Sequence, residues 1–196
     1  MKSQQTFFIV PGFKQQATDK SYSYLVSFLE SKNFKVVLVP IKWDRRVMSD
    51  YISDFKKYYQ KNKAKTNYVL GFSYGAVITF SSASDLLPDK IFLCSLSPDF
   101  KEDILTMKPW MLDYVGKNRI NDSRMRSGID IAKNLKIPSV IFYGEKEGRQ
   151  YPQLKIRCEE TVKLAKNSKL IVVRESPHQI DNPEYKKSVL KELQQL

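Results

Sequence analysis

Several sequence features that are typical of particular protein classes are scarce or absent here. No run approaches the roughly 18 continuous apolar residues of a membrane-spanning helix, so we expect no membrane span. The apolar run Thr6–Val10 is short, is stopped by Pro11-Gly12 and has no small-residue cleavage site after it. We interpret it as a strand rather than a signal peptide, which makes a cytoplasmic location the default expectation.

Cysteine is also scarce, and nucleic-acid-binding motifs are absent. With 2 cysteines and no secretion signal, Cys94 and Cys158 are expected to be free thiols. No stretch resembles a zinc finger, an RNA-recognition motif or an aromatic stacking platform with basic flanks, so we expect no nucleic-acid partner. There is no repeat, low-complexity tract or linker, and 196 residues fit a single domain spanning 1–196.

Acidic residues are outnumbered: 33 Lys and Arg stand against 21 Asp and Glu, for a net charge of +12. The basic residues are spread over the whole length, and their one short cluster, at Lys56, Lys57, Lys61, Lys63 and Lys65, is typical of the solvated face and end of a helix. We interpret the charge as a Lys-rich surface that favours solubility. The alternative is a surface that recruits an anionic partner such as nucleic acid or lipid headgroups.

Short apolar runs, most of them unbroken by polar residues, alternate with helix-period segments along the chain. This pattern is typical of strands buried on both faces of a parallel sheet. The predicted strands are Phe7–Val10, Phe34–Ile41, Tyr68–Phe72, Ile91–Leu96, Ser139–Tyr143 and Leu170–Val173. The alternation predicts an α/β fold: a three-layer sandwich around a mainly parallel sheet of about six strands. The stretch 99–137 departs from this alternation of strands and helices and is expected to form a small lid or substrate-binding wall.

The strongest local signal is Gly71-Phe72-Ser73-Tyr74-Gly75, which joins a predicted strand to a predicted helix. In that context G-x-S-x-G predicts a nucleophile elbow: a tight, strained turn that projects the Ser73 hydroxyl above the sheet. Gly71 and Gly75 keep strand and helix close together. The N–H of Tyr74, at the helix N-terminus, is a candidate oxyanion donor, and the N–H of Phe13 in the turn after the first strand is the second.

His178 is the only histidine, and it lies between the last predicted strand and the last helix. A general base for Ser73 needs a pKa near neutrality and a loop that lets the ring reach the serine, so His178 is the predicted base. The carboxylate that orients it should fall between the two, on a loop after a strand. Glu147, in Gly144–Gly148, is the first choice; Glu145 and Asp99 are the alternatives.

On these motifs the chain resembles the α/β-hydrolase superfamily, in its minimal form with no cap or a small lid. The resemblance places the catalytic triad at Ser73, Glu147 and His178 and implies acyl transfer to water, with no metal or organic cofactor. The superfamily's first-strand turn often reads His-Gly, whereas this chain has Pro11-Gly12.

The leading hypothesis is therefore a serine hydrolase that cleaves a small-molecule carboxylic ester or thioester. Phe13, Tyr74, Trp110 and Met111 are candidates for an apolar acyl pocket, although core packing explains Trp110 and Met111 equally well. The alternative is a non-catalytic binding module on the same scaffold, and a lyase or peroxidase-like reaction stays open. The sequence leaves the acyl-chain size and the oligomeric state open.

Overall fold

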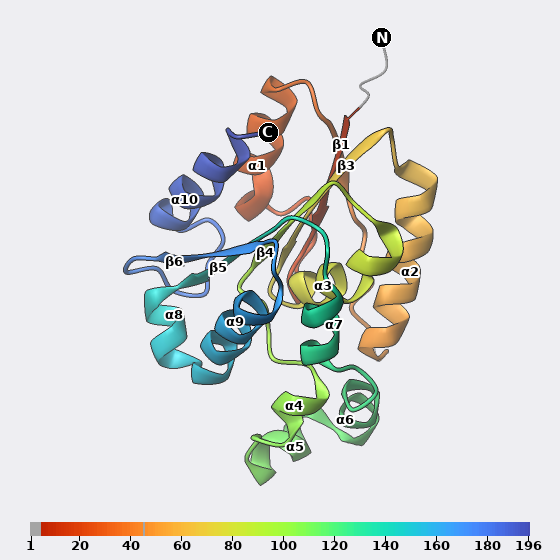
Figure 1. Ribbon diagram of the computed structural model, residues 1–196, viewed down its shortest axis with the longest axis vertical. Coiled ribbons are helices and arrows are strands. Elements are labelled where there is room, and N and C mark those ends of the chain that lie inside the picture. Colours follow the sequence, from red (N-terminus) through yellow and green to blue (C-terminus); the bar gives the residue numbers. More distant parts are fainter. Residues whose placement is uncertain (1–4, 45) are drawn as a thin grey trace.

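A sheet of six parallel strands forms the centre of the molecule (Figure 1). The computed structural model describes residues 5–44 and 46–196, except for the side chains of Met111 and Tyr114. The strand order is β2-β1-β3-β4-β5-β6. The strands are β1 (Gln5–Val10), β2 (Lys35–Leu38), β3 (Thr66–Phe72), β4 (Lys90–Cys94), β5 (Ser139–Gly144) and β6 (Ser168–Val173). The predicted six-stranded α/β sandwich is confirmed.

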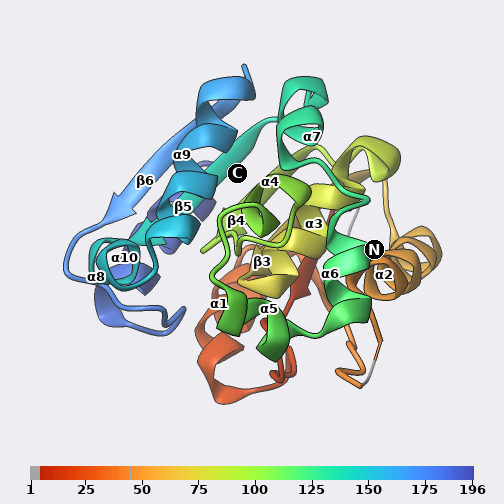
Figure 2. The same ribbon diagram turned by 90° about the horizontal axis from the view of Figure 1, so that it is seen from below.

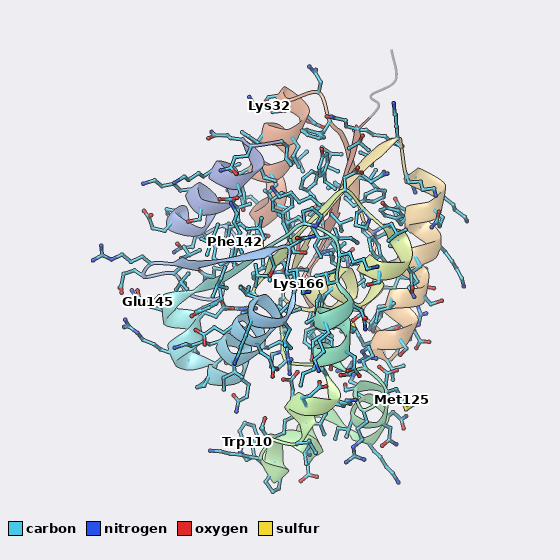
Figure 3. All side chains as sticks on the ribbon, in the orientation of Figure 1. Lys32, Trp110, Met125, Phe142, Glu145 and Lys166 are labelled. Carbon is cyan, nitrogen blue, oxygen red and sulfur yellow. The ribbon has the colours of Figure 1, made fainter. Side chains whose placement is uncertain are left out.

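Helices cover both faces of the sheet, as parallel strands with crossover connections require. One face carries α1 (Ser23–Ser31), after the short 3₁₀ turn η1 (Lys20–Tyr22), and α10 (Pro183–Leu193). Their apolar side chains, such as Leu25 and Val189, pack in one core with Phe7 and Phe142 of the sheet. In Figure 3, Phe142 accordingly lies deep inside the molecule.

The opposite face carries α2 (Met48–Asn62), α3 (Tyr74–Leu86), α7 (Gly128–Asn134) and α9 (Pro152–Leu164). The central helix, α3, is buried along most of its length because it packs against the sheet and against α2 and α7. Phe80 and Ala83 of α3 belong to the second apolar core, together with Phe8 of β1 and Cys158 of α9.

The segment between β4 and β5 contains α4 (Lys101–Ile104), α5 (Pro109–Val115), α6 (Lys117–Ser123) and α7. Figure 1 places α4, α5 and α6 beyond the carboxyl ends of the strands, at the lower end of the molecule, and Figure 2 shows them in front of the sheet from below. Helix α7 contacts α3 and α9, so it belongs to the helical layer, and only α4–α6 project from it.

Three local predictions are corrected. The second strand ends at Leu38 instead of Ile41, before Pro40, which has no N–H for the sheet. The last strand lies at the sheet edge and is only half-buried, because β5 is its one neighbour. The segment after β5, expected as a loop, forms the short helix α8 (Glu145–Gln150).

Surface and thiol predictions agree with the structure. Lys57, Lys61, Lys63 and Lys65 are exposed, and Cys94 and Cys158 are buried and free. No helix within residues 5–44 or 46–196 combines the length and the apolar character needed to cross a bilayer.

Candidate active site

Ser73 occupies a strained turn between β3 and α3. Its backbone angles, φ 55° and ψ −118°, lie in a region that residues with a side chain rarely adopt. The N–H of Ser73 donates to the carbonyl of Cys94 (2.8 Å), which fixes the turn to the neighbouring strand. The elbow also needs its glycines, because a Cβ atom at Gly75 would lie 2.2 Å from the Val10 carbonyl oxygen, and one at Gly71 would lie 2.2 Å from that of Gly75.

His178 lies in the loop between β6 and α10 and reaches Ser73 across the carboxyl edge of the sheet. Its Nε2 is 3.1 Å from Ser73 Oγ, and its Nδ1 contacts the Oε1 atom of Glu147. The imidazole packs against Phe72, with the ring centroids 4.9 Å apart. Three side chains that are 105 and 31 residues apart in sequence are therefore joined in one hydrogen-bonded row.

The direction of these hydrogen bonds follows from the groups involved. An ionised carboxylate only accepts hydrogen bonds, so Nδ1 of His178 carries the proton that is donated to Glu147. Nε2 is then the unprotonated nitrogen and accepts the Ser73 hydroxyl proton. This is the arrangement in which an imidazole can remove a proton from a serine.

Glu147 is fully buried, and neutral groups hold its second oxygen. Oε2 accepts hydrogen bonds from the N–H of Gly144 (2.8 Å) and from Ser95 Oγ (2.9 Å). The turn into α8 is fixed by the carbonyl of Ser176, which accepts from the N–H groups of Lys146 and Glu147. These bonds tie the acid-bearing turn to the loop that carries His178.

Two residues of this network, Ser95 and Tyr185, were not predicted. Ser95 follows β4 with a positive φ of 57°, and its Oγ is 2.9 Å from the hydroxyl of Tyr185 on α10. Burial raises the pKa of Tyr185 well above its ordinary value, so its hydroxyl stays protonated and remains a donor. Serine and tyrosine are too common in sequences for either residue to stand out, and neither belongs to a motif.

Ser97 is a third unpredicted residue, and it lies next to Ser73. Its Oγ is 3.1 Å from Ser73 Oγ, and its side chain is buried. Since the Ser73 proton is directed to His178, the hydroxyl of Ser97 is the donor in this pair. Ser97 thus gives the Ser73 oxygen a second hydrogen-bond partner.

The two alternative acids are engaged elsewhere. Asp99 accepts hydrogen bonds from Ser123 Oγ (2.8 Å) and Arg126 Nη2 (2.8 Å), and burial raises its pKa to about 6. Glu145 lies at the periphery (Figure 3) and accepts from the N–H of Glu175 (3.1 Å) and from Arg149 Nη2 (2.6 Å). The structure therefore brings Glu147, and not these two carboxylates, to His178.

The predicted oxyanion residues, Phe13 and Tyr74, are neighbours, with ring centroids 5.4 Å apart. Tyr74 begins α3 directly after Ser73, which places the positive end of the helix dipole beside the hydroxyl. The rings of Phe13 and Tyr74 line a narrow space of about 20 Å³, together with Trp43 and Arg119.

A larger pocket, of about 260 Å³, opens directly at Ser73 and His178. Its other lining residues are Ser97, Pro98, Asp103, Met107, Tyr151, Gln153 and Leu154. Of the predicted acyl-pocket residues, Phe13 and Tyr74 do not line this pocket but the separate narrow space. Trp110 is 65% exposed on the projecting α5 (Figure 3), and the side chain of Met111 lies outside the described residues.

Within residues 5–44 and 46–196, no group of three or more His, Cys, Asp or Glu side chains is arranged to hold a metal ion. The chemistry available at this edge of the sheet is that of a serine, an imidazole and a carboxylate in a row. Hydroxyl groups from Ser95, Ser97 and Tyr185 support them.

The parallel sheet, the strained serine after β3 and the histidine after the last strand define the α/β-hydrolase fold, and this chain has that fold. Neither a protein-family model nor a curated protein matches the sequence. Solved structures match over nearly the whole chain at low sequence identity, so they establish the fold alone.

Three of these structures illustrate the likeness. A lipase-esterase related protein from Clostridium acetobutylicum has a TM-score of 0.70 and 19% identity, covering 99% of this chain and 95% of its own. Est1E from Butyrivibrio proteoclasticus has a TM-score of 0.77 and 14% identity, covering 99% and 90%. MenH from S. aureus has a TM-score of 0.70 and 14% identity, covering 100% and 95%.

Proposed function

We propose that the protein is a serine hydrolase that cleaves a carboxylic ester or thioester through an acyl-enzyme on Ser73. The observation that carries this proposal is the row of three side chains in which Ser73 Oγ lies 3.1 Å from His178 Nε2 and the other ring nitrogen contacts Glu147. A strained serine backbone at the same position adds to it, since such strain is concentrated at functional sites.

The reaction follows from these groups. His178 removes the hydroxyl proton as Ser73 attacks the acyl carbon, and Glu147 stabilises the imidazolium that forms. The backbone N–H groups of Tyr74 and Phe13 stabilise the oxyanion. The imidazolium returns its proton to the leaving alcohol or thiol. His178 then activates a water molecule that releases the acid from Ser73.

The projecting segment α4–α6 supplies part of the substrate site in this proposal. Asp103 and Met107 from this segment line the pocket at Ser73, together with Tyr151 and Leu154 from the region of α8 and α9. The stretch 99–137 thus acts as a small lid or wall on a single domain. Among proteins with the same fold, the lipase-esterase related protein and Est1E bound to ferulic acid are compatible with an ester substrate for this chain.

The test combines a covalent probe with turnover. A fluorophosphonate should label the wild-type protein, and the wild-type protein should release nitrophenol from nitrophenyl esters. Ser73→Ala and His178→Ala should lose both the labelling and the turnover. Circular dichroism and thermal unfolding establish that each variant is folded. Labelling or turnover that survives in folded Ser73→Ala contradicts the proposal. A wild-type protein that is inert but binds heparin in a salt-sensitive manner supports the binding module instead.

A further inference from the structure

The pocket at Ser73 restricts the acyl group that this chain can accept, an inference that rests on the proposed function. One end of the pocket is the catalytic end, with Ser73, Ser97 and His178. Asp103 and Gln153 also line a neighbouring pocket of about 240 Å³, which contains neither Ser73 nor His178. They therefore mark the side that faces away from the nucleophile.

The walls between the two ends are mainly apolar. Pro98 and Met107 contribute from the segment after β4, and Tyr151 and Leu154 contribute from the segment after β5. Leu154 is 3% exposed and belongs to the apolar core, so its wall is backed by packed side chains. Such a surface favours a hydrocarbon chain, because burying each CH₂ group contributes about 0.8 kcal/mol, or about fourfold in an equilibrium or rate.

The volume sets the length of that chain. An apolar cavity of about 150 Å³ binds one benzene molecule, which has six carbon atoms. In proportion, the pocket, at about 260 Å³, holds about ten non-hydrogen atoms. An acyl group of about six to eight carbon atoms fills it, whereas an acetyl group leaves most of it empty and a dodecanoyl group exceeds it.

The charges at the far end exclude one class of acyl group. The guanidinium of Arg157 is buried and already engaged, with Nη2 2.6 Å from Asp103 Oδ1 and Nη1 2.7 Å from Glu160 Oε2. Glu102 lies nearby, 3.9 Å from the same guanidinium. Three carboxylates thus surround one cation, and an acyl chain that ends in a carboxylate meets an excess of negative charge despite the basic surface of the protein.

We propose that the acyl group of the natural substrate is uncharged and of medium length, about six to eight carbon atoms, and that acyl groups ending in a carboxylate are rejected. The proposal assigns the acyl half of the substrate only; the alcohol or thiol half leaves from the catalytic end.

The length is tested with nitrophenyl acetate, butyrate, octanoate and laurate on the wild-type protein. We expect kcat/KM to rise by up to about fourfold per added CH₂ group as far as octanoate and to fall for laurate. In Leu154→Trp and Met107→Trp, which fill the pocket from two different segments of the chain, the ratio of octanoate to acetate should fall at least about tenfold. Met107 lies in a loop and is only half-buried, so this second variant remains informative if Leu154→Trp does not fold.

The matched control is Leu105→Trp, which adds the same side chain two residues from Met107 at a position that is 86% exposed. It should leave the chain-length profile unchanged. A flat wild-type profile, or a laurate rate above the octanoate rate, overturns the proposed length. An equal change in the profile of Leu105→Trp overturns the assignment of the walls.

The rejection of acyl groups that end in a carboxylate is tested with two esters whose acyl groups have the same number of carbon atoms. These are nitrophenyl hexanoate and the nitrophenyl monoester of adipate. We expect kcat/KM for hexanoate to exceed that for the adipate monoester at least about 100-fold, and Gln153→Lys to reduce this ratio. Equal rates for the two esters in the wild type overturn the charge assignment.

The fluorophosphonate reaction distinguishes a failure of this substrate preference from a failure of the proposed function. Labelling of Ser73 with a flat chain-length profile overturns the inference and leaves the proposed function intact. A folded protein without labelling overturns both.

Discussion

The neighbouring strands β4 and β5 each lead into a buried carboxylate, and the two carboxylates have opposite surroundings. After β4, Asp99 faces the guanidinium of Arg126, which neutralises its charge. After β5, Glu147 is held by the neutral donors Gly144 N–H and Ser95 Oγ and keeps one oxygen for His178. A carboxylate that is already paired with one cation attracts a second cation only weakly, because the first neutralises most of its charge. Neutral donors hold Glu147 in place and leave its charge for the imidazolium that the proposed mechanism requires.

The largest expected effect on activity comes from removing the charge of Glu147. Glu147→Gln should lower kcat by about 10³- to 10⁴-fold, because an amide facing Nδ1 favours the wrong imidazole tautomer and provides no negative charge. Asp99→Asn is the matched control, since it makes the same chemical change at the end of the next strand and should retain activity. Steady-state kinetics on octanoate esters measures both, with thermal unfolding as the test of folding.

The opposite outcome has a clear meaning. If Glu147→Gln retains full activity while Asp99→Asn is inactive and folded, the acid is Asp99 and the loops must rearrange on substrate binding. Glu145→Gln completes the set and should also retain activity, because the Glu145 carboxylate is bound to Arg149 and to the backbone of Glu175.

A smaller effect is expected at Ser95. Ser95→Ala removes one of the two donors to Glu147 Oε2, which leaves the carboxylate less well fixed, and kcat should fall about tenfold. Ser188→Ala is the control, because that hydroxyl donates to the Glu184 carbonyl on the outer part of α10. The pH dependence of kcat distinguishes positioning of the acid from a general loss of stability: Ser95→Ala should shift the profile, and Ser188→Ala should not.

Ser97 should have a still smaller effect on the rate. Ser97→Ala removes the second partner of Ser73 Oγ, and we expect a change of about three- to tenfold in the rate of fluorophosphonate labelling. Ser97→Thr keeps the hydroxyl and should restore part of the rate. Unchanged labelling in Ser97→Ala would show that this hydrogen bond is not used in the attack.

The last prediction concerns stability alone. Burial raises the pKa of Asp99 to about 6 in the folded protein, so the folded state binds its proton more tightly than the unfolded state, in which the pKa is about 3.9. The stabilisation is present below pH about 4 and is lost as pH rises through about 6. The free energy of unfolding of Asp99→Asn relative to the wild type should therefore increase over this range in urea titrations. A constant difference contradicts the raised pKa.

The sequence predicted the parts of the molecule whose pattern is repetitive or chemically rare. The β-branched and aromatic runs indicated all six strands because both faces of most of them are covered by helices. Ser73 and His178 stood out because one lies in a glycine-flanked motif and the other is the only imidazole. For the acid, three carboxylates satisfied the same rule of chain order, and only the contacts of each carboxylate in the fold separate them.

What the sequence could not indicate depends on contacts between distant segments. The expected position of the acid after a strand favoured a loop at 144–148, yet the segment is a helix because Glu147 accepts from the N–H of Gly144 and Ser176 accepts from its first turn. Ser95, Ser97 and Tyr185 are common residue types whose importance comes from what they touch. The walls of the pocket were missed for the same reason, since Met107 and Leu154 are 47 positions apart.

The order in which the functional groups occur along the chain has a consequence for biosynthesis. Under the proposed function, Ser73 is made early, whereas the imidazole that activates it is made 105 residues later. A partly synthesised chain, or one cut before His178, then carries a hydroxyl no more reactive than that of any other serine. The appearance of activity during refolding would therefore report that these two distant segments of the polypeptide have come together.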